Sequence, residues 1–474
     1  MNAGAAPILL WFRRDLRLSD HAALTAAAQT GAPVIPVFIW DEVMEKMGAA
    51  PRWRMGQGVQ NFSNVLRGIG SRLILRRGPA EAVLTDLAAE TGAAAVYWSR
   101  CYDPDSIARD TGVKTTLKNK GLEAKSFAGH LLFEPWDVQT GEGKYYRVYS
   151  PMWRNVRGRE VGSETPKIDK LRPPRIWPKT EKLEDWSLGS RLFRGAEVLS
   201  RHAVVGEAAA QDRLAEFVAE RLHNYKKRRD FLAEDATSGL SENLTYGEIS
   251  PRQCWRAATR AAEEGNPGAE HFMKELVWRE FAYHLAYHTP EIIEKNWREG
   301  WDAFPWSDDE SGAAAQAWKQ ARTGIELVDA GLREMYVTGR MHNRARMIVA
   351  SYLTKHLMLH WKIGLNWFAD CLTDWDPAAN AMGWQWVAGC GPDAAPYFRI
   401  FNPATQAEKF DPDGTYRTRW LAERSAAPQR DALSYFDAIP KAWGLSASDP
   451  YPSPVVDLKA GRDAALAAYA ARDF

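Results

Sequence analysis

The first 130 residues of this chain alternate between short apolar runs and helical patterns. The apolar runs are ILLWF (8–12), VIPVFIW (34–40), LILRR (73–77) and AAVYWSR (94–100). Unbroken runs of this length are typical of strands buried on both faces of a parallel sheet. The intervening patterns HAALTAAAQTG and AEAVLTDLAAETG each end at a glycine, a common helix stop. The alternation therefore predicts a doubly wound, Rossmann-like α/β domain over residues 1–130.

This predicted domain lacks the dinucleotide-binding fingerprint. The segment WFRRDLRLSDHAAL follows the first apolar run, where a GxGxxG motif would stand. The similar GQGVQN (56–61) follows no predicted strand. If the protein binds a dinucleotide, we expect the site to lie elsewhere in the chain.

The remainder of the chain divides into a connection and a helical region. The stretch PKIDKLRPPRIWPKTEKLEDW (166–186) contains four prolines and many charges, which is typical of an interdomain linker. We place this linker at residues 131–200. Beyond it, apolar residues recur at i, i+3, i+4 and i+7, for example in HFMKELVWREFAYHLAYH. Residues 201–474 are therefore predicted to form a large all-helical domain.

Composition limits the classes of protein that fit. A net charge of +1 gives no general attraction to nucleic acid, so any contact with DNA must use a local basic patch. Four widely spaced cysteines suggest neither a disulfide framework nor a zinc site, and they favour the reducing cytoplasm. The apolar run near the N-terminus is soon broken by Arg13, Arg14 and Asp15, so neither a signal peptide nor a membrane span is expected.

The chain contains 21 tryptophans, an unusual number. Core packing explains most of them, but stacking on planar ligands and electron relay are further uses of an indole. Trp384 and Trp386 are separated by one residue, so they cannot lie on the same face of a helix. This one segment therefore contributes side chains to at least two different surfaces.

Three polar motifs stand out in the helical half. ATSGLSENLTYGEISPRQ is a hydroxyl-rich loop with Ser250 as the expected N-cap before Pro251, and it suits either a pyrophosphate or an ordinary capped loop. ELVWREF places Glu275, Trp278 and Arg279 within one helical turn, and a surface ion pair between Glu275 and Arg279 is the alternative. MHNRARM places Asn343 and Met347 on one helix face.

His284 and His288, with Glu280 one turn earlier, form no HExxH motif, and we expect no metal.

Five segments together resemble the DNA photolyase/cryptochrome family. They are LLWFRRDLRLSDHAAL, ATSGLSENLTYGEISPRQ, ELVWREFAYHL, MHNRARMIVASYLTKHL and GWQWVAGCGPDAAPYFRIFNP, and they occur in order over nearly the whole chain. The chain is most similar to the bacterial photolyases that repair cyclobutane pyrimidine dimers, and within them to the class III proteobacterial subgroup. The resemblance implies light-driven electron transfer from reduced FAD to a dimer in duplex DNA, performed by a cytoplasmic monomer.

The resemblance also implies a set of flavin-binding residues in the helical domain. They are Tyr225, Thr237, Ser238, Gly239, Leu240, Ser241, Arg279, Asn343, Arg346, Asp374, Trp375, Asp376 and Asn380. Asn380 stands at the position that faces flavin N5, and an amide can hydrogen-bond N5 whether or not it carries a proton. Gly239 and Arg340 depart from the family pattern, since many relatives have Arg and Trp at these two positions. One phosphate contact is therefore expected to be absent or replaced.

The catalytic residues implied by the resemblance are Glu275, Trp278, Asn380 and Trp386. The two indoles would wall the pocket for a flipped-out lesion, and Glu275, expected to be protonated, would touch the pyrimidine edge. The implied DNA-binding set is Arg229, Glu275, Trp278, Asn343, Arg344, Met347, Trp386 and Arg399. Trp384, Trp361 and Trp306 match the relay that photoreduces the flavin, with core packing as the alternative for each. The segment after Trp386, GCGPDAAPYFRIFNP, is expected to form the rim of the pocket.

Some alternatives remain open at this stage. Methenyltetrahydrofolate is the expected antenna chromophore, with a deazaflavin or no antenna as the alternatives, because CYDPDSIARD (101–110) lacks the Asn-Glu pair of common folate-binding relatives. A cryptochrome-type photoreceptor without repair activity is the rival function. Asn380 and the two pocket tryptophans favour repair. An iron–sulfur photolyase would need four clustered cysteines in the helical domain, which has three.

Overall fold

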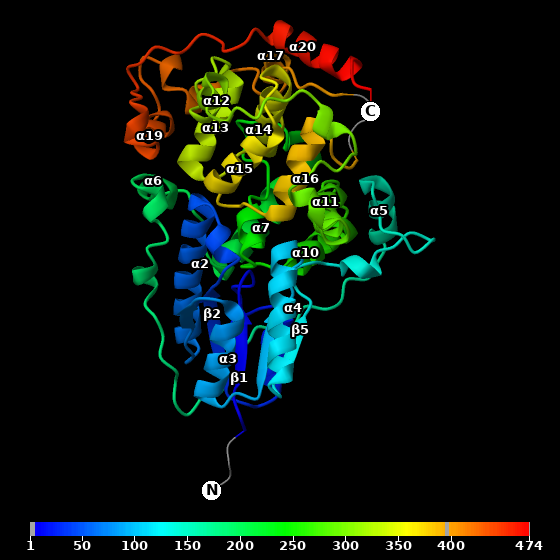
Figure 1. Cartoon of the computed structure of the whole chain (residues 1–474), viewed down its shortest axis with the longest axis vertical. Helices are drawn as coiled ribbons and strands as arrows, with labels where there is room; N and C mark the ends of the chain where they lie inside the picture. The colour runs from blue at the N-terminus through cyan, green and yellow to red at the C-terminus, as the bar shows by residue number, and fades with distance from the viewer. Residues whose placement is uncertain (1–4, 394–397, 474) are drawn as a thin grey trace.

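A computed structural model describes residues 5–393 and 398–473. Figure 1 shows a sheet-containing region at one end, where the N-terminus lies, and a helical region at the other. Residues 394–397, part of the expected pocket rim, lie outside the described residues.

The sheet has five parallel strands in the order β3-β2-β1-β4-β5. The strands are β1 (Ile8–Phe12), β2 (Val34–Trp40), β3 (Ile74–Arg77), β4 (Ala95–Ser99) and β5 (Glu123–Phe127). The first four match the predicted apolar runs to within one residue. The doubly wound α/β prediction is confirmed, because the central strand β1 pairs with β2 on one side and with β4 on the other.

Helices cover both faces of this sheet. α1 (Ala22–Gln29) and α2 (Ala49–Gly68) pack on the face formed by Ile8, Leu10 and Phe12. α3 (Ala80–Thr91) and α4 (Pro104–Asn119) pack on the opposite face. The glycine that ends α3 has a φ of +64°, a conformation that favours glycine and stops the helix.

The edge strand β5 was not predicted from the sequence. Its residues EAKSF alternate between exposed and buried positions instead of forming an apolar run. An edge strand can carry polar side chains because one of its sides faces solvent.

The connecting segment runs back along the sheet domain before it enters the helical region. Val34 N–H donates to Arg172 O over 2.9 Å, and Leu75 N–H donates to Thr180 Oγ1 over 2.9 Å. Two α-helices lie in this segment, α5 (Tyr149–Val156) and α6 (Gly195–Ser200). α5 packs against α11 of the helical region (Figure 1).

The helical region contains α7 to α20, as the sequence pattern predicted. The helices are α7 (Glu207–Glu216), α8 (Tyr225–Arg228), α9 (Ser241–Thr245), α10 (Pro251–Glu263), α11 (Ala269–His288), α12 (Ala313–Lys319), α13 (Glu326–Thr338), α14 (Asn343–Ser351), α15 (Trp361–Cys371), α16 (Pro377–Ala388), α17 (Pro403–Phe410), α18 (Thr415–Trp420), α19 (Arg430–Ala438) and α20 (Leu458–Ala470). The predicted N-cap of α10 is confirmed: Ser250 and Gln253 form a reciprocal capping box.

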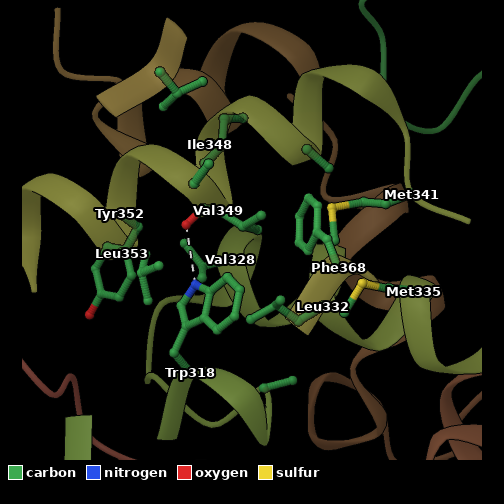
Figure 2. Close-up of a cluster of buried hydrophobic side chains, with 14 of the residues drawn as sticks. Trp318, Val328, Leu332, Met335, Met341, Ile348, Val349, Tyr352, Leu353 and Phe368 are labelled. Carbon is green, nitrogen blue, oxygen red and sulfur yellow. Dashed lines mark hydrogen bonds between the residues drawn. The ribbon is translucent and has the colours of Figure 1, made fainter. Parts of the chain in front are cut away.

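Trp318 lies at the centre of the helical core, where Figure 2 shows it surrounded by residues of α13, α14 and α15. Its indole N–H donates to Val349 O over 3.1 Å, so this fully buried side chain leaves no unpaired donor. The ring of Phe368 packs on Trp318 and also lies 4.9 Å from the ring of Trp384. This cluster therefore supports the helix that carries Trp384.

The four cysteines, Cys101, Cys254, Cys371 and Cys390, all have free thiols. Among residues 5–393 and 398–473, no helix has the length and apolar character needed to span a membrane.

Candidate active site

Six helices of the helical region (α8, α9, α11, α14, α15 and α16) contribute residues to one cavity of about 550 Å³. Most of the residues expected from the family resemblance lie on its wall. They are Tyr225, Arg229, Ser238, Ser241, Glu275, Trp278, Arg279, Asn343, Arg346, Met347, Asp374, Trp375, Asp376, Asn380, Trp384 and Trp386. Six expected residues lie away from the wall: Thr237, Gly239, Leu240, Arg344, Trp361 and Trp306. Arg399 lines a separate small cavity.

Hydroxyl groups and one ion pair lie together on part of the wall. Ser241 Oγ donates to Asp374 Oδ2 over 2.7 Å, and Arg346 Nη2 donates to the same oxygen over 2.8 Å. Ser238 and Thr245 line the cavity beside them. Hydroxyl and guanidinium donors in this arrangement suit the phosphates and hydroxyls of a nucleotide.

A second arginine lies against the backbone at the first departure from the family pattern. Gly239 has a φ of +62°, and Arg213 Nη1 donates to its carbonyl oxygen over 2.6 Å. A Cβ on Gly239 would lie 3.5 Å from Arg213 Cδ. The guanidinium of Arg213, on α7, thus lies beside position 239.

Helix α16 carries Asn380 into the cavity. Its N-cap, Asp376, accepts a hydrogen bond from Ala379 N–H, so the helix begins one turn before Asn380. Asn380 Nδ2 donates to Leu365 O over 3.1 Å, which fixes the orientation of the side-chain amide. Tyr283 and Arg14 also contact the Asp376 carboxylate; Arg14 Nη1 lies 3.7 Å from it.

The wall also contains buried polar atoms that have no hydrogen-bond partner among residues 5–393 and 398–473. These are Asp374 Oδ1 and the indole nitrogens of Trp375 and Trp384. Buried polar atoms are normally hydrogen-bonded, so unpaired ones on a cavity wall indicate groups that serve a ligand. Together with the apolar surface of Leu276, Phe368 and Val387, this mixture fits a large planar cofactor with a polar tail, as FAD is.

Glu275 and Arg279 of the ELVWREF motif do not pair as the ion-pair alternative supposed. Glu275 forms its ion pair with Arg229, which belongs to the segment after α8. Arg279 donates instead to His130 O over 2.9 Å, and it lies 3.4 Å from Glu280. The alternative was wrong because both arginines reach partners on other segments, which helical spacing alone does not reveal.

Two indoles and a thioether lie on the same wall as Glu275. Trp278 is on α11, and Trp386 is on α16. Asn343 Nδ2 lies 3.9 Å from Met347 Sδ, so these residues share one face of α14, as predicted. The cavity therefore offers aromatic surface, a carboxylate and a guanidinium within one space, which suits two adjacent pyrimidines extruded from one DNA strand.

Trp384, Trp361 and Trp306 occupy buried positions in the helical core. Trp384 packs on Gly364 so closely that a Cβ there would lie 1.9 Å from its ring. Gly364 is one turn beyond Trp361 on α15, so Trp384 packs against the helix that carries Trp361. His360 lies between the other pair, with its ring centroid 5.4 Å from Trp306 and 5.5 Å from Trp361.

The two remaining expected DNA contacts are held by intramolecular interactions. Arg344 Nη2 pairs with Asp230 Oδ2 at 2.7 Å and lies over the ring of Phe410. The carbonyl of Arg399 accepts a hydrogen bond from Lys355 Nζ over 2.6 Å.

A second cavity of about 470 Å³ lies between the sheet region and the helical region. Residues of the 101–110 segment line it, together with Arg13 and Arg14 from the end of β1 and residues of α15. Trp375 and Asn380 line both cavities, so the two spaces share a wall.

The histidines that could have formed a metal stripe have other partners. His284 Nε2 accepts a hydrogen bond from Tyr146 N–H over 3.0 Å, and burial lowers the pKa of His284 to about 3. His288 stacks on Tyr145. Within the described ranges, no group of three or more His, Cys, Asp or Glu side chains could hold a metal ion.

Sequence reasoning missed several residues of the site. Phe272, Leu276, Phe368 and Leu372 line the cavity with apolar side chains, which look like ordinary core positions in the sequence. Arg14 was noticed only as a charge near the N-terminus. Its position directly after the first apolar run, at the carboxyl end of a strand, was the available signal.

Comparison with known proteins decides the family. One family model, described as DNA photolyase, matches residues 8–170, and another, the FAD binding domain of DNA photolyase, matches residues 272–471. The deoxyribodipyrimidine photo-lyase of Agrobacterium fabrum is 45% identical over 99% of each chain. The chain belongs to the photolyase/cryptochrome family.

Two further relatives locate the chain within the photolyase/cryptochrome family. The crystal structure of a bacterial class III photolyase from Agrobacterium tumefaciens has a TM-score of 0.91 and 44% identity, covering 99% of this chain and 98% of that one. Cryptochrome-2 of Arabidopsis thaliana is more distant, at 35% identity over 96% of this chain and 77% of its own. The FAD-binding character of the helical region follows from the family model.

Proposed function

We propose that this chain is a deoxyribodipyrimidine photo-lyase that splits cyclobutane pyrimidine dimers in duplex DNA. One observation carries the proposal: a single cavity combines a nucleotide-binding wall, the amide of Asn380, and the side chains of Glu275, Trp278 and Trp386. The name and the full-length similarity of the Agrobacterium fabrum relative support it.

Reduced FAD, when bound and excited by light, supplies the electron that opens the cyclobutane ring, and the electron returns afterwards. The residues of the chain itself bind and orient the cofactor and the extruded bases. Ser238, Ser241 and Arg346 would hold the cofactor's polar tail, and the Asn380 amide would meet flavin N5. Trp278 and Trp386 offer indole faces to the extruded bases, where stacking contributes roughly 1–3 kcal/mol per base.

The test compares light with darkness. The FAD-loaded protein is mixed with an oligonucleotide that carries one cyclobutane thymine dimer, and restored thymines are measured after blue light. Repair in light and none in darkness is expected. A flavin-loaded protein that binds the dimer no more tightly than undamaged DNA and restores no thymine would instead support the cryptochrome-type photoreceptor.

For the antenna we propose methenyltetrahydrofolate in the second cavity. Lys362 on its wall suits an anionic pigment, and the shared residues Trp375 and Asn380 would bring it close to the flavin. Heat-denatured protein should release a folate into the supernatant, identified by absorption and mass. Asn366→Trp, at an exposed position on the wall, should remove this pigment and leave the FAD content unchanged. Release of a deazaflavin, or of FAD alone, would contradict the assignment.

We also propose that the protein acts as a cytoplasmic monomer. Four free thiols are typical of a reducing compartment. Light scattering after size-exclusion chromatography should give a mass near 53.3 kDa, whereas a dimer would give twice this value.

A further inference from the structure

Tyr149, at the start of α5, contacts the indole of Trp278 face to face. The ring centroids lie 3.7 Å apart, and the planes differ by 4°. The Tyr149 hydroxyl donates to Lys274 O over 2.8 Å, one helical turn before Trp278 on α11. The tyrosine ring is therefore fixed at both ends against the helix that carries the indole.

This stack determines which surface of Trp278 is available. A parallel ring at van der Waals distance occupies one face of the indole. Because Trp278 also lines the cavity, its opposite face and its edge are what the cavity receives. Phe281 packs edge-on against both rings and restricts the indole further.

The same tyrosine is connected to the second wall indole. The backbone N–H of Tyr149 faces the carboxylate of Asp393, in the loop after α16, and it opposes the rise in the pKa of this carboxylate that burial causes. The indole N–H of Trp386 donates to the backbone carbonyl of Asp393 over 3.2 Å. Asp393 has a φ of +51°, a conformation that only a few residue types tolerate, so the loop has a defined shape at this point.

We propose that Tyr149 and Asp393 are positioning residues that set the separation of Trp278 and Trp386. This proposal rests on the proposed function, because the object that fits between the indoles is the extruded dimer. α5 lies outside the helical region that forms the cavity, so the connecting segment takes part in recognition of the lesion. Neither residue touches a reacting atom.

Two variants of Tyr149 distinguish the contribution of its ring from that of its hydroxyl. Tyr149→Leu removes the stack, and Tyr149→Phe keeps it while losing the hydrogen bond to Lys274. In darkness, the preference of wild-type protein for dimer-containing over undamaged oligonucleotide is compared with that of each variant. We expect Tyr149→Leu to lower this preference about 10-fold through weaker dimer binding, and Tyr149→Phe to retain it within about 3-fold.

Substitutions of Asp393 give a second, independent test of the proposal. Asp393 lies in a loop, where a substitution perturbs folding less than one in a helix does. Asp393→Gly keeps the backbone carbonyl and tolerates the positive φ, but it loses the carboxylate. Asp393→Asn keeps an acceptor and serves as the matched control. We expect Asp393→Gly to raise the KM for dimer photorepair about 5-fold with kcat and FAD content unchanged, and Asp393→Asn to resemble wild type.

The outcomes distinguish the two proposals. If wild-type protein prefers the dimer and Tyr149→Leu and Asp393→Gly keep that preference, the positioning role is overturned while the proposed function stands. The role is also overturned if the variants lose FAD and bind both oligonucleotides equally weakly, since that pattern is a general structural defect. A wild-type protein without any preference would overturn both proposals.

Discussion

Arg229 holds the carboxylate of Glu275 in an ion pair on the wall of the cavity. His271 Nε2 lies 3.8 Å from the same carboxylate. The sequence led us to expect Glu275 against the edge of the lesion, and Arg229 must be drawn away, for instance by a DNA phosphate, before the whole carboxyl group is available for that contact. The ion pair and the expected contact are therefore alternatives for one side chain.

This relationship predicts how Glu275 tolerates substitution. Glu275→Gln is neutral and keeps a hydrogen-bond donor, so dimer repair by reduced enzyme should fall by no more than about 3-fold. Glu275→Ala has no donor and should lose about 10-fold, as expected for one hydrogen bond of roughly 1.4 kcal/mol. Repair yields at saturating light measure this. Equal losses in the two variants would show that a neutral hydrogen-bond donor is not what the lesion requires.

Asn380 should govern the redox behaviour of the bound flavin rather than its retention. Asn380→Ala removes the amide that the Leu365 carbonyl orients, while the nucleotide-binding wall is untouched. FAD content should stay within about 20% of wild type, whereas photoreduction under blue light with a thiol donor should slow several-fold. Time courses of flavin absorption test this prediction. An unchanged photoreduction course would remove Asn380 from its proposed place at N5.

The buried tryptophans should matter for photoreduction and not for repair. Trp306→Phe and Trp361→Phe keep an aromatic ring but raise the energy needed to oxidise it, so photoreduction of oxidised flavin should slow at least 10-fold in each. Enzyme that has been reduced chemically should repair dimers at the wild-type rate. Trp318→Phe is the matched control, because Trp318 is equally buried and lies in the packing cluster of Figure 2. Normal photoreduction in both relay variants would point to another path.

The buried side chain of Lys355 should make the free energy of unfolding depend on pH. Burial lowers the pKa of Lys355 from 10.5 to about 7, although its ammonium lies over the ring of Phe398 and donates to Arg399 O. Between about pH 7 and 10.5 the unfolded chain holds this proton and the folded protein releases it. The free energy of unfolding therefore rises with pH across this window, by about 2 kcal/mol between pH 7 and 9.

Lys355→Met tests this linkage because it keeps the volume and removes the titrating group. The Tm of the variant relative to wild type should be higher at pH 7 than at pH 9. Cys390 and Arg399 are the charged or titratable neighbours that act on Lys355, and they are the same in both proteins. Parallel pH profiles would show that Lys355 does not titrate in this range.

The sequence was sufficient for most of the fold. Strands buried on both faces are continuous apolar runs, so β1 to β4 could be located within one residue. β5 was not predicted because an edge strand does not need an apolar sequence. The N-cap Ser250 was predictable because a capping box is a local feature of four residues.

Residues of the site could be predicted only where their arrangement follows from a local sequence motif. Asn343 and Met347 could be assigned to one face of α14 from their spacing alone. The partners of Glu275 and Arg279, and the stack of Tyr149 on Trp278, join segments more than 40 residues apart in the chain. Such contacts depend on how the helices pack, which periodicity does not encode.

The choice of lesion follows from the cavity face of α14. Repair of (6-4) photoproducts requires transfer of a hydroxyl or amino group and hence a general acid. Asn343 and Met347 share one face of α14 and line the cavity, and neither side chain can act as a general acid. His342 instead caps α14 by accepting from Arg344 N–H, and burial lowers its pKa to about 4, so it is neutral at physiological pH. Among the described residues, those that line the wall thus include no histidine that could donate the proton.

The most direct measurement therefore sets the two lesions side by side. Reduced, FAD-loaded protein is mixed with duplex oligonucleotides that carry either one cyclobutane thymine dimer or one (6-4) photoproduct, and restored bases are counted after blue light and after darkness. We predict light-dependent restoration of the cyclobutane dimer and no restoration of the (6-4) photoproduct. Restoration of the (6-4) photoproduct while the cyclobutane dimer stays intact would contradict the account.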